Sequence, residues 1–154
     1  MASLFKINPT QKQFFFWQQW LFWSSILFAL FGIIYAIYEN NPLFHPYNES
    51  LAQIFYNKTD LPDNVKPIFA FNCGPMGGTI ACCYLLLAFI AKYPFRKKEI
   101  WARNAIMVAF GTWVLLDSAN CIYYGVYFQI YIINAFSIMV KALPIIFTWK
   151  AFRD

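Results

Sequence analysis

The sequence predicts an all-α, polytopic membrane protein, a four-transmembrane-helix bundle with both termini in the cytoplasm. Two observations predict this fold class. Of the 154 residues, 60% are hydrophobic and only 12% are charged, whereas soluble domains average about 25% charged residues. The apolar residues also gather in four runs, at about 13–38, 67–91, 104–124 and 126–149, and each run is long enough to cross a bilayer as a helix. We expect a single membrane domain over residues 1–154.

The distribution of charge predicts the orientation of the bundle. Residues 92–103 form a basic hinge, and further basic residues lie near both ends of the sequence. Cytoplasmic loops carry an excess of lysine and arginine, so we expect the hinge and both termini in the cytoplasm and the loop 39–66 outside it. The protein is then a multi-pass protein of the cell membrane, which in a bacterium is the cytoplasmic or inner membrane. These orientation signals account for the net charge of +5, and we expect no nucleic acid as a partner.

The first run contains no charged residue from Gln13 to Tyr38. We interpret it as a retained first span, because it is longer than the core of a signal peptide. The loop 39–66 that follows is the only sizeable hydrophilic segment. Its residues 47–57, YNESLAQIFYN, favour a short amphipathic helix that lies on the membrane or caps the mouth of the bundle. Asn48 and Asn57 begin N-x-S/T sequons, which are relevant only in a eukaryotic source.

The second run is rich in small residues in its outer half. Gly74 and Gly78 form a GxxxG step, and Gly77 and Ala81 form a second pair with the same spacing. Rows of small residues let two transmembrane helices approach closely. We therefore expect a helix-packing surface here.

The same part of the run holds a proline. Pro75 removes one backbone hydrogen bond, and the amide of Asn72 can satisfy a group that is freed. The alternative to helix packing is thus a loosened helix end that binds a small ligand or ion.

The third and fourth runs form a hairpin with a tight connection at about Gly125. It carries two ionisable residues within apolar segments, Asp117 and Lys141. Folding the chain at Gly125 puts Asp117 opposite Ala135 and leaves Lys141 roughly 9 Å deeper along the helix axis. Helical side chains lean toward their own N-terminus, so these two lean toward each other in antiparallel helices. An ion pair, direct or through one water, is compatible with this geometry.

Polar residues extend both positions into stripes. Asn120 follows Asp117 by three residues, and Asn134 and Ser137 precede Lys141 by seven and four, so each set lies on one helix face. One interpretation is that the stripes hydrogen-bond the helices together. The other is that they line a path for a proton, ion or ligand. We favour the path for Asp117 and leave both interpretations open for Lys141.

Cysteine and histidine limit the chemistry that the chain can perform. No cysteine–histidine cluster has zinc spacing, and the single histidine cannot ligate a haem from both sides, so we expect no metal and no cofactor. Cys73 and Cys121 lie at similar predicted depths, and a disulfide between them is compatible with that geometry. The sequence has no C-x-x-C pair, however, for thiol exchange.

Three hypotheses for the function follow. We favour a non-enzymatic membrane protein, either an accessory subunit or a helical bundle that binds a lipid or small ligand, because no catalytic constellation is present. Its expected partners are membrane lipids, together with further copies of itself or a larger membrane complex. The first alternative is a component of a proton or small-solute transporter that uses Asp117 and Lys141. The second is a quinone-linked thiol oxidoreductase that uses Cys73 and Cys121.

Overall fold

A computed structural model describes residues 9–38 and 41–152, and every regular element in this part of the chain is helical. The longer helices are α1 (Pro9–Ile37), α2 (His45–Tyr56), α3 (Lys66–Ile90), α4 (Ile100–Tyr124) and α5 (Ala135–Thr148). Shorter elements extend them: the 3-10 turns η1 (Pro42–Phe44) and η4 (Trp149–Phe152), and the π-helical turns η2 (Ala91–Phe95) and η3 (Gln129–Asn134).

The structure confirms the prediction of an all-helical fold with four helices that are long and apolar enough to cross a membrane. Within the described residues these helices are Gln11–Ile37, Lys66–Phe95, Ile100–Tyr124 and Gln129–Phe152. The short helix expected at 47–57 is present as α2.

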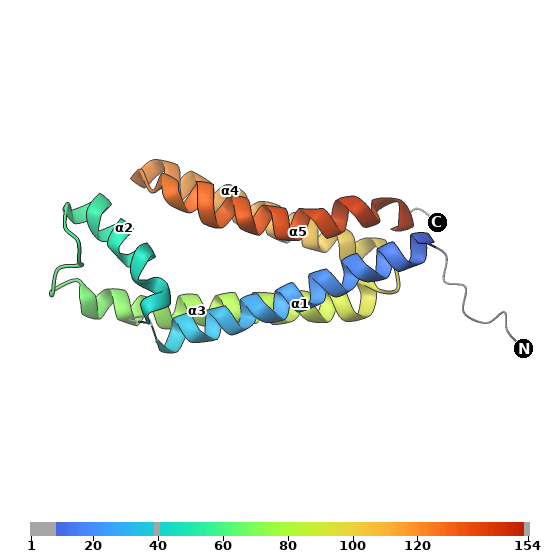
Figure 1. Ribbon diagram of the computed structural model, residues 1–154, viewed down its shortest axis with the longest axis horizontal. Helices are drawn as coiled ribbons and strands as arrows, with labels where there is room; N and C mark the ends of the chain where they lie inside the picture. The colour runs from blue at the N-terminus through green and yellow to red at the C-terminus, as the bar shows by residue number, and fades with distance from the viewer. Residues whose placement is uncertain (1–8, 39–40, 153–154) are drawn as a thin grey trace, which may run out of the picture.

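The helices form two layers (Figure 1). α1 and α3 pack side by side in one layer, and α4 and α5 lie in the other. The layers meet at the end where η2 and η4 lie, which we call the basic end. They diverge toward the opposite end, which we call the α2 end, and α2 crosses the opening between them there.

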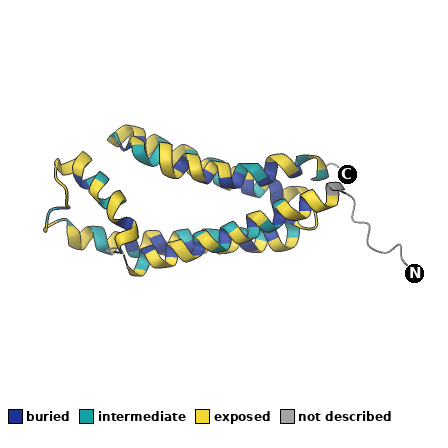
Figure 2. Ribbon diagram, viewed as in Figure 1, coloured by how far each residue is buried: buried dark blue, intermediate teal, exposed yellow. Residues whose placement is uncertain are grey.

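Apolar side chains face outward from all four long helices. Figure 2 shows exposed residues over the outer surfaces and buried residues mainly where helices face one another. α4 is the least covered of the four, since 11% of its apolar window is buried, compared with 33% in Gln129–Phe152. An apolar outer surface of this extent suits a hydrocarbon environment.

The connection between α4 and the last helix is a tight turn at Gly125. The backbone of Gly125 has a φ of 74°, which glycine adopts at little cost. The N–H of Val126 donates to the carbonyl of Cys121 at 2.8 Å, and the N–H of Gly125 donates to that of Ile122 at 3.3 Å. These two bonds cap the end of α4, and the helices on either side are antiparallel neighbours.

Glycines set the close approach of α1 to α3. A Cβ atom added to Gly77 would lie 2.5 Å from the carbonyl oxygen of Gly32 and 2.6 Å from the amide nitrogen of Ala36. The pair Gly77 and Ala81 therefore lies in the contact with α1. A Cβ atom added to Gly74 or Gly78 would meet nothing within 4 Å. The packing role expected for this GxxxG step is thus not realised within the chain, because α1 covers the neighbouring face of α3.

An aromatic cluster closes the basic end. Phe14 of α1 stacks on Phe95 of η2 with ring centroids 5.9 Å apart, and Phe152 of η4 packs edge-on against Phe95 at 4.8 Å. Arg103, at the end of the hinge, is 9% exposed, and its guanidinium carbon lies 4.0 Å from the ring centroid of Trp149. This cation–π contact packs η4 against α4.

A proline in α5 explains a hydrogen bond between the layers. Pro144 has no N–H group, so the carbonyl of Val140, four residues earlier, lacks its helical donor. Trp20 of α1 donates its indole N–H to that carbonyl at 3.2 Å. Nearby, Trp17 stacks on Phe147 with ring centroids 4.8 Å apart. The layers are therefore joined at the carbonyl that the proline leaves without a donor from its own helix.

We expect Trp20→Phe to lower the free energy of unfolding by about 1 kcal/mol, because it leaves the buried carbonyl of Val140 without a donor. Pro144→Ala supplies a helical N–H for the same carbonyl, so Trp20→Phe should have a smaller effect in that background. Denaturant titration of the parent, the two single variants and the double variant in mixed micelles measures the coupling. Trp23→Phe, at a position that is 62% exposed, is the control. An equal effect of Trp20→Phe in both backgrounds contradicts the assignment.

Candidate functional site in the interlayer space

Lys141 lies where the two layers meet. Its side chain is fully buried, and its Nζ atom donates to the hydroxyl oxygen of Ser24 in α1 at 3.2 Å. The ring centroids of Phe28 in α1 and Tyr84 in α3 lie 4.5 and 4.8 Å from Nζ, and the two rings stack on each other. Cation–π contacts therefore hold the ammonium group, and Lys141 connects α5 to both helices of the other layer.

Asp117 lies nearer the α2 end and has a separate set of partners. Gln129 donates its Nε2 hydrogens to Oδ1 and Oδ2 of Asp117, at 2.9 and 3.0 Å. Asn134 donates from Nδ2 to Oδ2 of Asp117 at 2.7 Å and to the hydroxyl of Ser118 at 3.1 Å. The thiol of Cys121 lies 3.6 Å from Oδ2. Neutral hydrogen-bond donors thus hold the carboxylate.

The π-helical turn η3 explains how Gln129 and Asn134 reach one carboxylate. These residues are five positions apart, and in an α-helix this spacing turns two side chains onto different faces. In a π-helix the hydrogen bonds run between residues five apart, so the same two positions lie nearly one above the other. The extra residue in this turn therefore aligns both amides with Asp117.

Helix α2 reaches the same site through Tyr47. Its hydroxyl donates to Oε1 of Gln129 at 3.0 Å, and its ring packs on Phe128 with centroids 5.6 Å apart. Burial raises the pKa of Tyr47 to about 12, and the nearby carboxylate of Asp117 adds to the rise, so the phenol keeps its proton at neutral pH. Tyr47, Gln129, Asp117 and Asn134 form a continuous chain of hydrogen bonds, which we call the Asp117 network.

The structure corrects the expected ion pair between Asp117 and Lys141. Within the described residues both ion pairs involve Lys66 and neither involves these two side chains. Asp117 bonds to Asn134, and Lys141 lies seven residues further along the last helix, or about 10 Å. The tilt of the two side chains toward their helix N-termini cannot bridge this distance. Each side chain also has nearer partners. The transporter hypothesis, which used the two residues together, stays a prediction.

The structure also corrects the expected disulfide. Cys73 and Cys121 are both buried, and neither is part of a disulfide. They belong to different layers, α3 and α4, which diverge toward the α2 end (Figure 1). The separation of the layers keeps these two sulfurs from bonding to each other. The thiol oxidoreductase hypothesis stays a prediction.

The remaining polar residues of the sequence hypothesis divide into two groups. Asn134 and Ser137 are buried. Asn72 and Asn120 are exposed and lie outside the Asp117 network. The described residues contain no group of three or more His, Cys, Asp or Glu that could hold a metal ion.

Several residues of the site were not singled out from the sequence: Ser24, Phe28, Tyr47, Tyr84 and Gln129. Gln129 did carry a signal, because an amide within an apolar run needs a hydrogen-bond partner in a bilayer. The aromatic residues carried none, since 22% of the whole chain is aromatic.

The two layers lie apart between the Lys141 contacts and α2. Next to Lys141 they still touch directly, because the ring centroids of Phe28 and Phe136 lie 6.2 Å apart. Beyond it, toward the α2 end, α2 links them through Tyr47 and through Phe55, whose ring centroid lies 6.0 Å from that of Tyr124.

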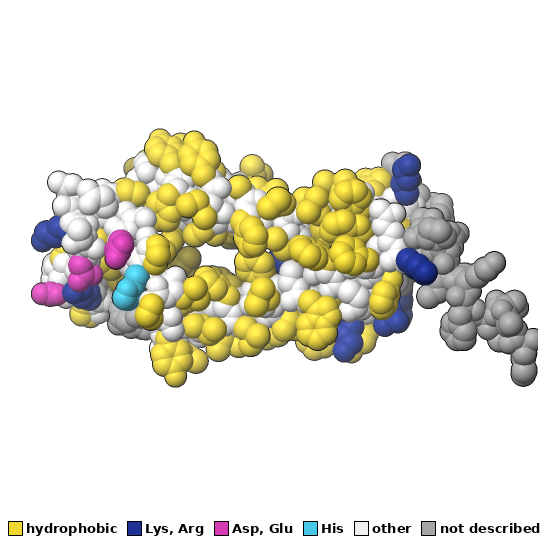
Figure 3. Space-filling model, viewed as in Figure 1, with side chains coloured by type: hydrophobic (Ala, Val, Ile, Leu, Met, Phe, Trp, Pro, Cys, Tyr) yellow, Lys and Arg dark blue, Asp and Glu magenta, His cyan; other side chains and the backbone are white. Residues whose placement is uncertain are grey.

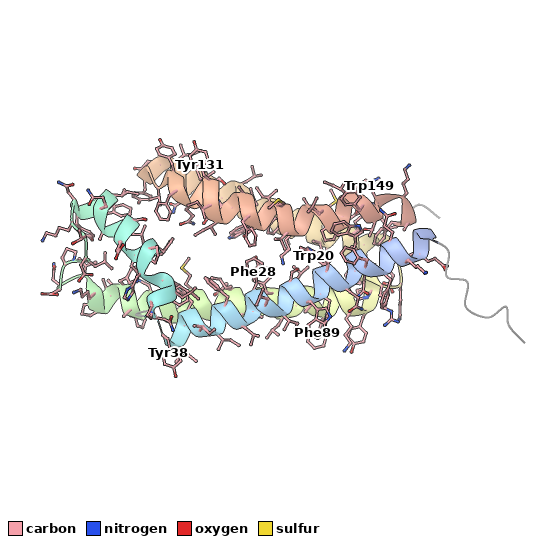
Figure 4. All side chains as sticks on the ribbon, viewed as in Figure 1. Trp20, Phe28, Tyr38, Phe89, Tyr131 and Trp149 are labelled. Atoms are coloured by element: carbon pink, nitrogen blue, oxygen red, sulfur yellow. The ribbon has the colours of Figure 1, made fainter. Side chains whose placement is uncertain are left out.

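The space-filling view shows a hollow between the layers in this region (Figure 3). Trp20 and Phe28 point from α1 toward the opposite layer, whereas Phe89 and Tyr131 point away from it (Figure 4). The hollow therefore has Lys141 and its aromatic partners toward its closed end and the Asp117 network toward α2.

The four apolar helices are compatible, by length and composition, with a multi-pass helical membrane protein. Comparisons with protein-family models, with curated proteins and with solved structures find no match. The function therefore has to be inferred from the residues of this chain.

Proposed function

We propose that the protein is a binding module of the cell membrane that holds a lipid or another small amphipathic ligand between its two helical layers. The observation that carries the proposal is the hollow between the layers, which ends at a fully buried lysine. Binding in this hollow requires no catalytic group. Assembly with further copies or with a larger complex, as an accessory subunit, stays a prediction.

The walls of the hollow suit an amphipathic ligand. Ligand sites are mostly apolar and have a few polar groups that fix orientation. Here Phe28 and Phe136 supply aromatic surface and the partly exposed Asp117 supplies a negative charge, while Lys141 lies fully buried behind Phe28. Neither charge has an ionic partner among the described residues. Ionisable groups are costly at membrane depth, so a polar group of a ligand would stabilise Asp117.

The proposal includes an orientation, with the basic end in the cytoplasm. The connection from η2 to α4 carries Lys92, Arg96, Lys97 and Lys98, and such clusters favour the cytoplasmic side. The orientation prediction also used basic residues within 1–8 and 153–154, which lie outside the described residues. The hollow then opens toward the outer leaflet under α2.

Photo-crosslinking with a lipid that carries a diazirine in its acyl chain tests the proposal. We expect saturable labelling of residues that face the hollow, Phe28 and Phe136, which excess unlabelled lipid suppresses. Phe89 and Tyr131 point away from the layers (Figure 4), so their labelling should persist under competition. Native mass spectrometry in mild detergent should show about one retained lipid for each chain. Equal competition at both sets of residues, or no retained lipid, would contradict the proposal.

A further inference from the structure

We infer that the Asp117 network binds a primary ammonium group, and that the amphipathic ligand of the hollow therefore carries an amine. The inference rests on the proposed function and names the chemical class of its ligand. Its starting point is the set of hydrogen-bond acceptors that the chain leaves unused at this site.

The side-chain oxygen of Asn134 is one of these acceptors. Asn134 is 1% exposed, and its Oδ1 atom is buried without a hydrogen-bond partner among the described residues. The amide nitrogen of the same group is fully used, since it donates to Asp117 and Ser118. A buried polar atom without a partner is destabilising, so this oxygen is matched to a donor from outside the chain.

Asp117 supplies the second acceptor and the charge. An ionised carboxylate offers about four lone-pair positions. Oδ2 interacts with Gln129, Asn134 and Cys121, whereas Oδ1 accepts from Gln129 only. The donors to Asp117 are all neutral, so its negative charge is not balanced. A ligand that fits must bring a positive charge and at least two N–H or O–H donors.

The position of the network favours an ammonium group that is attached to an apolar chain. Asp117 precedes the end of α4 at Tyr124 by seven residues, which is about 10 Å along the helix. This depth lies between the outer surface and the middle of a hydrocarbon core of about 30 Å. Asp117 is partly exposed, whereas Lys141 is fully buried. An ammonium group that enters the hollow therefore meets Asp117 first.

The chemistry distinguishes a primary ammonium from a quaternary one. A primary ammonium presents three N–H donors, and the inference assigns two of them to Oδ1 of Asp117 and Oδ1 of Asn134. A trimethylammonium group has the same charge and no donor. The ammonium can belong to a phospholipid headgroup or to a free amine, and these two sources share the recognition chemistry.

A lipid series with increasing N-methylation tests the inference on the unmodified protein. Nanodiscs contain phosphatidylethanolamine, its monomethyl and dimethyl derivatives, or phosphatidylcholine, all with the same acyl chains. We expect retention measured by native mass spectrometry to fall along the series, with about a ten-fold or greater difference between its two ends, as hydrogen bonds to charged groups predict. Competition with free ethanolamine separates the two sources. Displacement by free ethanolamine assigns recognition to the ammonium alone, and resistance to it assigns the site to the lipid.

Variants of two residues on α4 supply the matched control. Asp117→Asn removes the charge at nearly constant size and should abolish the preference for phosphatidylethanolamine. Asn120→Ala, at an exposed position one turn away, should keep it.

Equal retention of phosphatidylethanolamine and phosphatidylcholine by the unmodified protein overturns the inference while leaving the proposed function standing. Stronger retention of phosphatidylglycerol than of phosphatidylethanolamine overturns it as well. If the protein retains none of these lipids in preference to detergent, the proposed function fails too.

Discussion

Gly77→Ala should lower the free energy of unfolding by about 2 kcal/mol, as overpacking of a close contact does. The added Cβ atom would lie 2.5 Å from the carbonyl oxygen of Gly32. Backbone atoms cannot rotate away as a side chain can, so α1 and α3 have to separate. SDS titration in mixed micelles, followed by circular dichroism, measures the loss of stability.

Gly78→Ala is the matched control on the same helix. A Cβ atom at Gly78 meets nothing within 4 Å, and alanine is favoured over glycine in a helix by roughly 1 kcal/mol. This variant should be as stable as the parent or more so. Combining Gly77→Ala with Gly32→Ala should be less than additive, because the first change already separates the helices. A larger loss for Gly78→Ala than for Gly77→Ala would show that α1 packs on the other face of α3.

Lys141→Ala should destabilise the bundle by about 3 kcal/mol, because truncation of a fully buried side chain leaves a cavity between the layers. It also removes the contacts of the ammonium with Phe28 and Tyr84. The same titration measures this effect.

Lys141→Met separates the effect of charge from that of volume. Methionine fills a similar space without a buried charge, and replacing a buried ion by an apolar residue is often neutral or stabilising. We expect the stability of Lys141→Met to stay within about 1 kcal/mol of the parent. If Lys141→Met is as unstable as Lys141→Ala, the ammonium itself, rather than packing, holds the layers together.

The four long helices could be predicted because their signal is local. Length and hydropathy of a run require no knowledge of what packs on it, and Gly125 marks the last turn by its freedom to adopt positive φ. The pairing of faces is not local. Gly74 with Gly78 and Gly77 with Ala81 have the same spacing, and only the position of α1 decides which pair is covered.

The partners of the two ionisable residues were predicted incorrectly for two physical reasons. The hairpin was expected to place Ala135 opposite Asp117, but the π-helical turn shifts the register, so Gln129 and Asn134 face the carboxylate. Lys141 was considered only against its own hairpin, whereas its partners come from α1 and α3. Contacts between segments that are far apart in the sequence leave no trace in a local pattern.

The position of α1 has a consequence for how the protein is made. α1 leaves the ribosome before α5, and two hydrogen bonds, from Trp20 to Val140 and from Lys141 to Ser24, join these helices. α1 and α3 can associate as soon as both have been synthesised, but the polar atoms of α1 that face α5 gain these partners only after α5 has been synthesised. Until then Ser24 and the indole of Trp20 lack their final partners, so the two layers close only as a late step of biogenesis.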